Sequence, residues 1–313
     1  MRRLIQKAAV SVILCASMVI QTTHAANEPA LEMKVFTSSE DHMGLGVNST
    51  LIMGQQDAVL VDAQFTLSNA HRLTAEILES GRNLTHIYIT HLHPDHFMGL
   101  PVITQAFPNA KVVSIKESAE DVNGAFDFKI SYWGKQVLGM NGAKTKINVE
   151  TLAEPVIMLE GNRLEIIGPL QGDSANASAV WVPSIKTLVA GDLVFNNAHA
   201  WISDAKTPEL RQAWLDALDQ LSTLGAEVVV PGHAPSNTLL QPEAIAFTAQ
   251  YIREFIELLS SSENGEEIIA TLAARYPDAS LMFALDYSAR ILRDDYQWEG
   301  EWPPELRATK VVR

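Results

Sequence analysis

The chain has almost no cysteine. Its only cysteine is Cys15, near the N-terminus, and none follows in the 313-residue sequence. No disulfide can therefore cross-link the rest of the chain, and no thiolate there can bind a metal ion. A metal site beyond this point has to be built from histidine and carboxylate side chains, which are the other common ligands of zinc and related ions.

Positive charge is also scarce. The sequence has 23 lysines and arginines against 37 aspartates and glutamates, a formal net charge of −14. Residues 1–25 contain three of the basic residues and no acidic one, so the remainder has 20 basic and 37 acidic residues and a charge of 20 − 37 = −17. Such a chain repels polyanions, which argues against nucleic acid as a partner and favours a small-molecule substrate.

No apolar run near the N-terminus is long enough to span a bilayer comfortably. The run from Ala8 to Ile20 follows three basic residues and precedes the cleavage pattern Thr23-His24-Ala25, as in a secretory signal. We therefore expect residues 1–25 to be a signal peptide and the mature protein to be periplasmic or secreted, with no stable membrane insertion after cleavage. A signal anchor is the alternative.

Histidine is unevenly distributed and concentrates in one stretch, THLHPDH, at residues 90–96. The preceding letters, NLTHIYIT, are β-branched and aromatic and predict a strand that ends at this stretch. In extended backbone His91 and His93 point to the same side. A proline then turns the chain, so that Asp95 and His96 reach the same space from another direction. This density of ligand side chains favours a divalent-metal site over an ordinary polar turn.

Three other apolar segments each carry one residue of a type that can bind a metal ion. They are AVLVDAQF with Asp62, LVAGDLVF with Asp192 and VVVPGHAP with His233. Together with the H-x-H-x-D-H pattern, and in this order, they resemble the metallo-β-lactamase superfamily over roughly residues 35–235. The resemblance implies an α/β protein with a metallo-β-lactamase-like αββα sandwich and a C-terminal helical extension.

The same resemblance implies two adjacent metal ions, with zinc expected and iron or manganese as alternatives. His91 and His93 would hold the first ion, Asp95, His96 and His233 the second, and Asp192 would bridge them. Such a site hydrolyses its substrate with a metal-bound hydroxide. Asp95 would also act in catalysis, by orienting the hydroxide and moving its proton.

One position departs from the family pattern. The family supplies a further histidine from a Gly-His-Ser/Thr motif, but residues 97–198 contain no histidine, and Asp173 falls in register. If Asp173 is a ligand, its carboxylate would make the first site more suitable for hard ions and weaken its preference for zinc. Asp173 could instead be a turn residue, which would leave the first site incomplete. His199 is a second candidate for the absent ligand, or a catalytic residue that contacts substrate or donates a proton; a purely structural histidine is the remaining alternative.

The segments outside these motifs define the domain organisation. We expect a catalytic domain at 26–240 and, at 241–313, C-terminal helices and an aromatic tail packed on the same domain. Helical spacing is clear at 242–260 and 266–275, and a helix at 68–80 should end at the glycine that follows it. The tail, residues 294–306, could dock across the core or on a partner subunit, so an oligomer is compatible with the sequence.

The favoured function is an exported metal-dependent hydrolase that cleaves a small ester, lactone or amide. The stretch between Asp192 and Lys206 offers no cation for a substrate carboxylate, which favours a neutral substrate. A β-lactamase is the first alternative. An iron-dependent redox enzyme and a non-catalytic metal-binding protein of the same fold are the others, because both would suit the change at Asp173.

Overall fold

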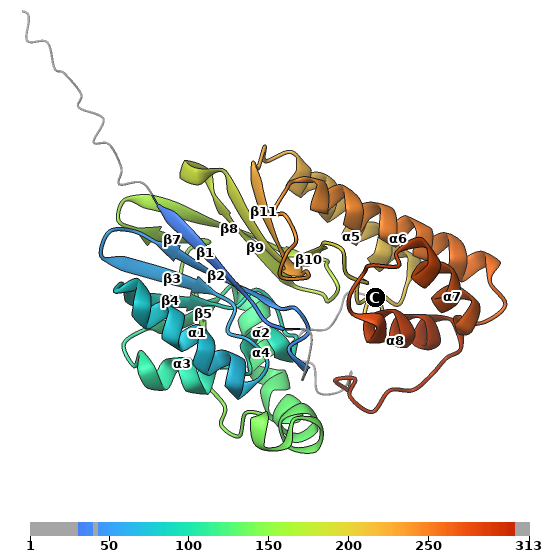
Figure 1. Ribbon diagram of the computed structural model, residues 1–313, viewed down its shortest axis with the longest axis horizontal. Helices are drawn as coiled ribbons and strands as arrows, with labels where there is room; N and C mark the ends of the chain where they lie inside the picture. The colour runs from blue at the N-terminus through green and yellow to red at the C-terminus, as the bar shows by residue number, and fades with distance from the viewer. Residues whose placement is uncertain (1–30, 40–42, 304–313) are drawn as a thin grey trace, which may run out of the picture.

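The computed structural model describes residues 31–39 and 43–303, so the expected signal peptide at 1–25 lies outside the described residues. Two β-sheets stack face to face at the centre of the molecule (Figure 1). The first sheet has the order β1 (Glu32–Thr37), β2 (Asn48–Met53), β3 (Asp57–Val61), β4 (Asn83–Tyr88), β5 (Lys111–Ser114) and β6 (Glu150–Thr151). The second has the order β11 (Val228–His233), β10 (Thr187–Phe195), β9 (Ala177–Val182), β8 (Asn162–Leu170) and β7 (Val156–Leu159).

The space between the sheets is filled mainly by aliphatic side chains. Val59 and Val61 from β3 form one buried cluster with Val180 and Val182 from β9. Strand β10 is buried along its whole length, which explains why its sequence is a nearly continuous apolar run. Strands buried on both faces favour β-branched apolar residues. The strands could therefore be predicted from such segments.

Helices cover the outer faces of both sheets, which confirms the αββα arrangement (Figure 1). They are α1 (Leu67–Ser80), α2 (Pro94–Phe97), α3 (Leu100–Ala106), α4 (Lys116–Lys129), α5 (Pro208–Ser222), α6 (Glu243–Ser261), α7 (Gly265–Arg275) and α8 (Met282–Arg293), with a π-helical turn, η2 (Ile130–Val137), after α4. Helix α1 begins after Thr66, whose hydroxyl accepts a hydrogen bond from the Asn69 N–H, and it ends at Gly81 with φ 66°, as the sequence predicts. Helix α8 was not predicted.

The C-terminal helices share the core of the sandwich. Thr248 on α6 both accepts a hydrogen bond from the Phe195 N–H, at 2.9 Å, and donates one to the Phe195 carbonyl, at 2.8 Å. The tail also packs on its own chain: the Trp298 ring lies 5.2 Å from Trp201 and 5.7 Å from Trp133, measured between centroids. The sequence allows the tail to dock across the core or on a partner subunit. The described part of the tail lies across the core.

Within residues 31–39 and 43–303, every helix falls short of the length and apolar character that crossing a membrane requires.

Trp214 fixes α5 to β10, the strand that carries Asp192. Its side chain is fully buried, and its indole N–H donates to the Leu193 carbonyl at 2.9 Å. We expect Trp214→Ala to lower the free energy of unfolding by about 3 to 5 kcal/mol, because it leaves a cavity and an unpaired carbonyl. Chemical denaturation measures this, and the exposed Gln220→Ala on the same helix should change it by less than about 0.5 kcal/mol. Equal effects of the two variants would contradict the role of Trp214.

Candidate metal centre

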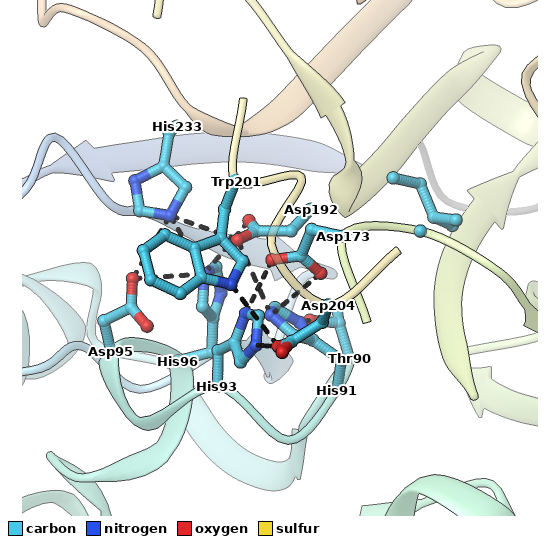
Figure 2. Close-up of polar contacts among 12 residues, drawn as sticks. Thr90, His91, His93, Asp95, His96, Asp173, Asp192, Trp201, Asp204 and His233 are labelled. Atoms are coloured by element: carbon cyan, nitrogen blue, oxygen red, sulfur yellow. Dashed lines mark hydrogen bonds and ion pairs between the residues drawn. The ribbon is translucent and has the colours of Figure 1, made fainter. Parts of the chain in front are cut away.

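The candidate ligands meet where strands of both sheets end (Figure 2). The loop after β4 carries residues 91–96, and β10 and β11 carry Asp192 and His233. Strands β10 and β11 are parallel, with Phe195 opposite His233, so their carboxyl ends lie at the same edge of the sheet. Parallel pairing therefore brings together side chains that are far apart in the sequence.

Two groups of buried ligand side chains result. His91, His93, Asp173 and Asp192 form the first, and Asp95, His96 and His233 form the second. Within each group one ligand atom per residue lies within 4.8 Å of all the others. The structure thus brings together all seven metal-ligating residues that the sequence suggested.

The spacing of these atoms fits metal coordination. Two ligand atoms bound tetrahedrally at about 2.1 Å from an ion are about 3.4 Å apart. His233 Nε2 lies 3.1 Å from Asp95 Oδ2, and His96 Nε2 lies 3.5 Å from His233 Nε2 and 3.7 Å from Asp95 Oδ2. In the first group, His91 Nε2 is 3.6 Å from Asp192 Oδ2 and 3.8 Å from Asp173 Oδ1. These separations are close to the edges of such coordination polyhedra.

Buried polar atoms without hydrogen bonds point to the same conclusion. His91 Nε2, both carboxylate oxygens of Asp173 and Asp192 Oδ1 are buried and form no hydrogen bond within the described structure. Leaving such groups unsatisfied costs roughly 1 to 3 kcal/mol each, and more when they are charged. Metal ions held by the two groups would satisfy these atoms, so the residues present fit a metal centre.

Asp192 lies between the two groups. Besides its contact with His91, its Oδ1 is 3.1 Å from His96 Nε2 and its Oδ2 is 3.2 Å from His233 Nε2. Gly232 makes room for this carboxylate, because a Cβ at position 232 would lie 1.8 Å from Asp192 Oδ1. The position is the one a bridging ligand requires.

Asp173 points into the first group. It is fully buried, and its Oδ2 lies 2.6 Å from His93 Nδ1. A turn residue of the kind considered for this position would use its carboxylate to cap nearby backbone N–H groups. The Asp173 oxygens instead face imidazole nitrogens, which favours its role as a ligand in the place of the absent histidine.

The charges of the site depend on one another. Burial lowers the pKa of His93, but the Asp173 and Asp204 carboxylates outweigh it and raise that pKa to about 10. Burial likewise lowers the pKa of His233, and Asp192 and Asp95 raise it to about 10. Without a metal ion these imidazoles carry protons that neutralise the carboxylates, and a bound cation would displace those protons.

Two further carboxylates orient the histidines. Asp62 accepts hydrogen bonds from the Thr90 N–H and hydroxyl and lies 2.7 Å from His96 Nδ1, which leaves His96 Nε2 facing the second group. Asp204 lies 2.9 Å from His93 Nε2, which leaves Nδ1 facing Asp173. Such partners fix the tautomer and the direction of a ligand imidazole. The sequence analysis missed Asp204; its position soon after Asp192 in the segment LVFNNAHAWISDA was the available signal.

His199 lies elsewhere. It is fully buried, its Nδ1 is 3.0 Å from the Tyr251 hydroxyl on α6, and burial lowers its pKa to about 4. Within the described chain it belongs to neither ligand group and does not line the cavity beside them. The structure therefore does not bring His199 together with the ligand groups, because its loop turns the ring toward α6, and a catalytic or ligand role for it stays a prediction.

A cavity of about 830 Å³ opens onto both groups. His93, Asp173 and Asp192 of the first group and Asp95 and His233 of the second line it. The rest of its wall is largely aromatic and aliphatic. A small molecule in this cavity can therefore reach both groups at once.

A two-sheet α/β sandwich with adjacent histidine and aspartate groups at one edge describes a class of proteins that can bind divalent metal ions. The family model described as the metallo-beta-lactamase superfamily matches residues 42–233, which is more than half of the chain. The chain belongs to the metallo-beta-lactamase superfamily.

Named relatives are distant. A metallo-beta-lactamase type 2 from Pseudomonas aeruginosa is 23% identical over 210 residues, which is 64% of this chain and 74% of the relative. An atrochrysone carboxyl ACP thioesterase from Pseudocercospora fijiensis is 29% identical over 99 residues, 29% of this chain and 30% of the relative.

Solved structures share the fold at similarly low identity. A metallo-beta-lactamase family protein from Thermus thermophilus superposes with a TM-score of 0.59 at 19% identity, covering 82% of this chain and 92% of that one. A metallo-beta-lactamase from Pontibacter korlensis gives a TM-score of 0.53 at 18% identity, covering 71% of this chain and 94% of that one. These likenesses show the sandwich fold.

Asp173 gives the sharpest test of the metal centre. We expect Asp173→Ala to lose about one metal ion per chain, because two imidazoles and one carboxylate leave that ion short of the four ligands zinc prefers. Asp173→His should bind zinc at least as tightly as the wild type. Titration with zinc, followed by elemental analysis, measures both, with Asp219→Ala on the exposed face of α5 as the control. Unchanged stoichiometry and affinity in Asp173→Ala would show that Asp173 is not a ligand.

Proposed function

We propose that the protein is an exported, metal-dependent hydrolase that cleaves a small ester, lactone or amide. The observation that carries the proposal is the shared cavity, in which Asp95, Asp173, Asp192, His93 and His233 face one space. A carbonyl group in this space would lie next to both metal positions. The seven candidate ligands are all histidine or aspartate, a set suited to zinc and to harder divalent ions.

Bound divalent ions would supply an activated water and polarise the substrate carbonyl. The protein's own contribution is to place the groups around them. Burial raises the pKa of Asp95, but His96 and His233 outweigh it and hold the pKa below its usual range. Asp95 is a carboxylate on the cavity wall, and its position there is what would let it accept a proton from water and pass it to the leaving group. Asp62 and Asp204 keep the ligand rings in position for this step.

The named relatives support carbonyl hydrolysis. One is named a metallo-beta-lactamase and the other a thioesterase, and both names describe cleavage of an acyl bond. A β-lactamase is the second candidate, favoured by the likeness to the Pseudomonas aeruginosa protein over 64% of the chain. An iron-dependent redox enzyme is the third, favoured by Asp173, because a second carboxylate in the first group suits iron better than a third imidazole would. Metal content separates the last of these from the hydrolases.

Asp95→Ala should lower turnover at least 10- to 100-fold, because the variant loses both a ligand and the proton carrier. The measurement is hydrolysis of a panel containing a simple ester, an acyl lactone, an anilide and a penicillin, by purified protein loaded with zinc, manganese or iron. Asp219→Ala is the control that removes an exposed carboxylate. Full activity of Asp95→Ala on the best substrate would refute the mechanism, and cleavage of the penicillin alone would select the β-lactamase.

The N-terminal pattern supports export, which we propose as the location of the activity. After expression of the whole gene, protein from the periplasmic fraction should begin at or near Ala26 when its N-terminus is sequenced. Retention of the uncleaved chain in the cytosolic fraction would contradict the proposal.

A further inference from the structure

Three of the four tryptophans that line the cavity come from distant parts of the chain and are joined by ring contacts. Trp133 lies on η2, Trp201 on the loop after β10, and Trp298 on the C-terminal tail, and all three line the cavity. The ring centroid of Trp298 is 5.2 Å from that of Trp201 and 5.7 Å from that of Trp133, with interplanar angles of 66° and 60°. We call these three side chains the tryptophan wall. Its continuous ring contacts make a large apolar surface.

The tryptophan wall is built into the structure. The Trp298 indole N–H donates to the Tyr132 hydroxyl at 3.2 Å, and its ring lies 5.5 Å from Tyr287 on α8. Gly300 lets the tail fold over this ring, since a Cβ at position 300 would lie 2.3 Å from Trp298 Cζ2. Lys206 then joins the tail to the loop after β10 through an ion pair with Glu301 at 2.7 Å. The tail is thus held in place over the cavity by several independent contacts.

The wall also reaches the metal centre. The Trp201 ring is 6.3 Å from the His93 ring, and its indole N–H donates to Asp204, the carboxylate that orients His93. One end of the wall therefore adjoins the first ligand group, and Trp298 and Trp133 extend away from it (Figure 2 shows Trp201 above His93 and Asp204). A substrate whose carbonyl reaches the ligand groups would lay the rest of its length against these rings.

The charges around the cavity argue against an anionic substituent. Outside the ligand groups, three carboxylates and two lysines of the described chain line it, and Lys206 is paired with Glu301, so no excess of positive charge is available there. The carboxylates are Asp121, Asp204 and Glu301, and the other lysine is Lys129. An ammonium group binds over an open ring face, and in each of the two edge-to-face contacts, Trp298 with Trp133 and Trp298 with Trp201, the edge of one ring occupies a face of the other. The wall suits an uncharged apolar group better than either ion.

We propose that the substrate carries a long or bulky, uncharged apolar group, which binds against the tryptophan wall, and that Trp298 is a specificity-determining residue. The part of this inference that concerns cleavage rests on the hydrolase function proposed above. The part that concerns recognition rests on the cavity alone and can be tested without activity.

The first experiment measures binding to metal-free protein. Calorimetric titration should show 1-octanol binding at least about tenfold more tightly than 1-butanol, because complete burial of four methylenes would give a difference of ~200-fold. Octanoate should bind more weakly than 1-octanol. Trp298→Ala should lose most of the preference for octanol. Tyr296→Ala is the matched control, because this exposed tyrosine lies on the same tail but does not line the cavity.

The second experiment measures cleavage by the metal-loaded protein. The ratio kcat/KM should be at least about tenfold higher for methyl octanoate or octyl acetate than for methyl acetate. Trp298→Ala should remove this preference, and Trp298→Leu should restore part of it. Acetylcholine should be a poorer substrate than 3,3-dimethylbutyl acetate, its uncharged analogue of the same shape.

The outcomes separate the two proposals. Absence of any ester, lactone or amide cleavage, together with Trp298-dependent octanol binding, would refute the hydrolase function and leave the recognition of an apolar group standing. Equal affinity of wild type for octanol and butanol would overturn the inference, and this measurement needs no variant to fold. Tighter binding of octanoate, or preference for acetylcholine, would also overturn it, as would unchanged chain-length preference in folded Trp298→Ala.

Discussion

The structure depends on a concentration of buried, mutually dependent charge. Asp95, Asp173 and Asp192 and four histidines are withdrawn from water at one edge of the sandwich. Carboxylates this close repel one another unless positive charge is placed between them, and in the protein without metal the imidazolium rings supply it. A bound cation would supply the same charge from a single point. The site is therefore stable only as a set, and removing one member leaves the others uncompensated.

The fold meets this requirement by taking ligands from rigid strand ends. Asp192 and His233 come from adjacent parallel strands that are buried along both faces, and the loop at residues 91–96 is held by Asp62 through Thr90 and His96. Strands packed in this way move little, which holds the ligand atoms at a fixed spacing. The loops that carry Asp173 and Asp204 then place two further carboxylates beside His93.

Much of this could be predicted from the sequence, because the signals are local. Continuous apolar runs predicted the strands, Gly81 predicted the end of α1, and the order of ligand-bearing segments predicted the family. Helix α8 was missed although its buried residues Ala284, Leu285, Ser288 and Ala289 have helical spacing. His199, Asp204 and the tryptophan wall depend on how loops and tail fold back across the sheets. Their contacts join residues far apart in the chain, such as Trp298 with Tyr132, and no periodic pattern encodes such pairs.

The loop after β10 has a consequence for how the protein could change over evolutionary time. Trp201 faces the cavity and Asp204 orients His93, and the two side chains are joined by a hydrogen bond of 3.3 Å. A substitution in this loop that reshapes the cavity would therefore disturb metal affinity as well. In the described tail, Trp298 shapes the cavity but does not orient a metal ligand. Its ring contacts are with other aromatic residues and not with a ligand histidine. New substrate preferences could accumulate in the tail while the metal centre stays intact.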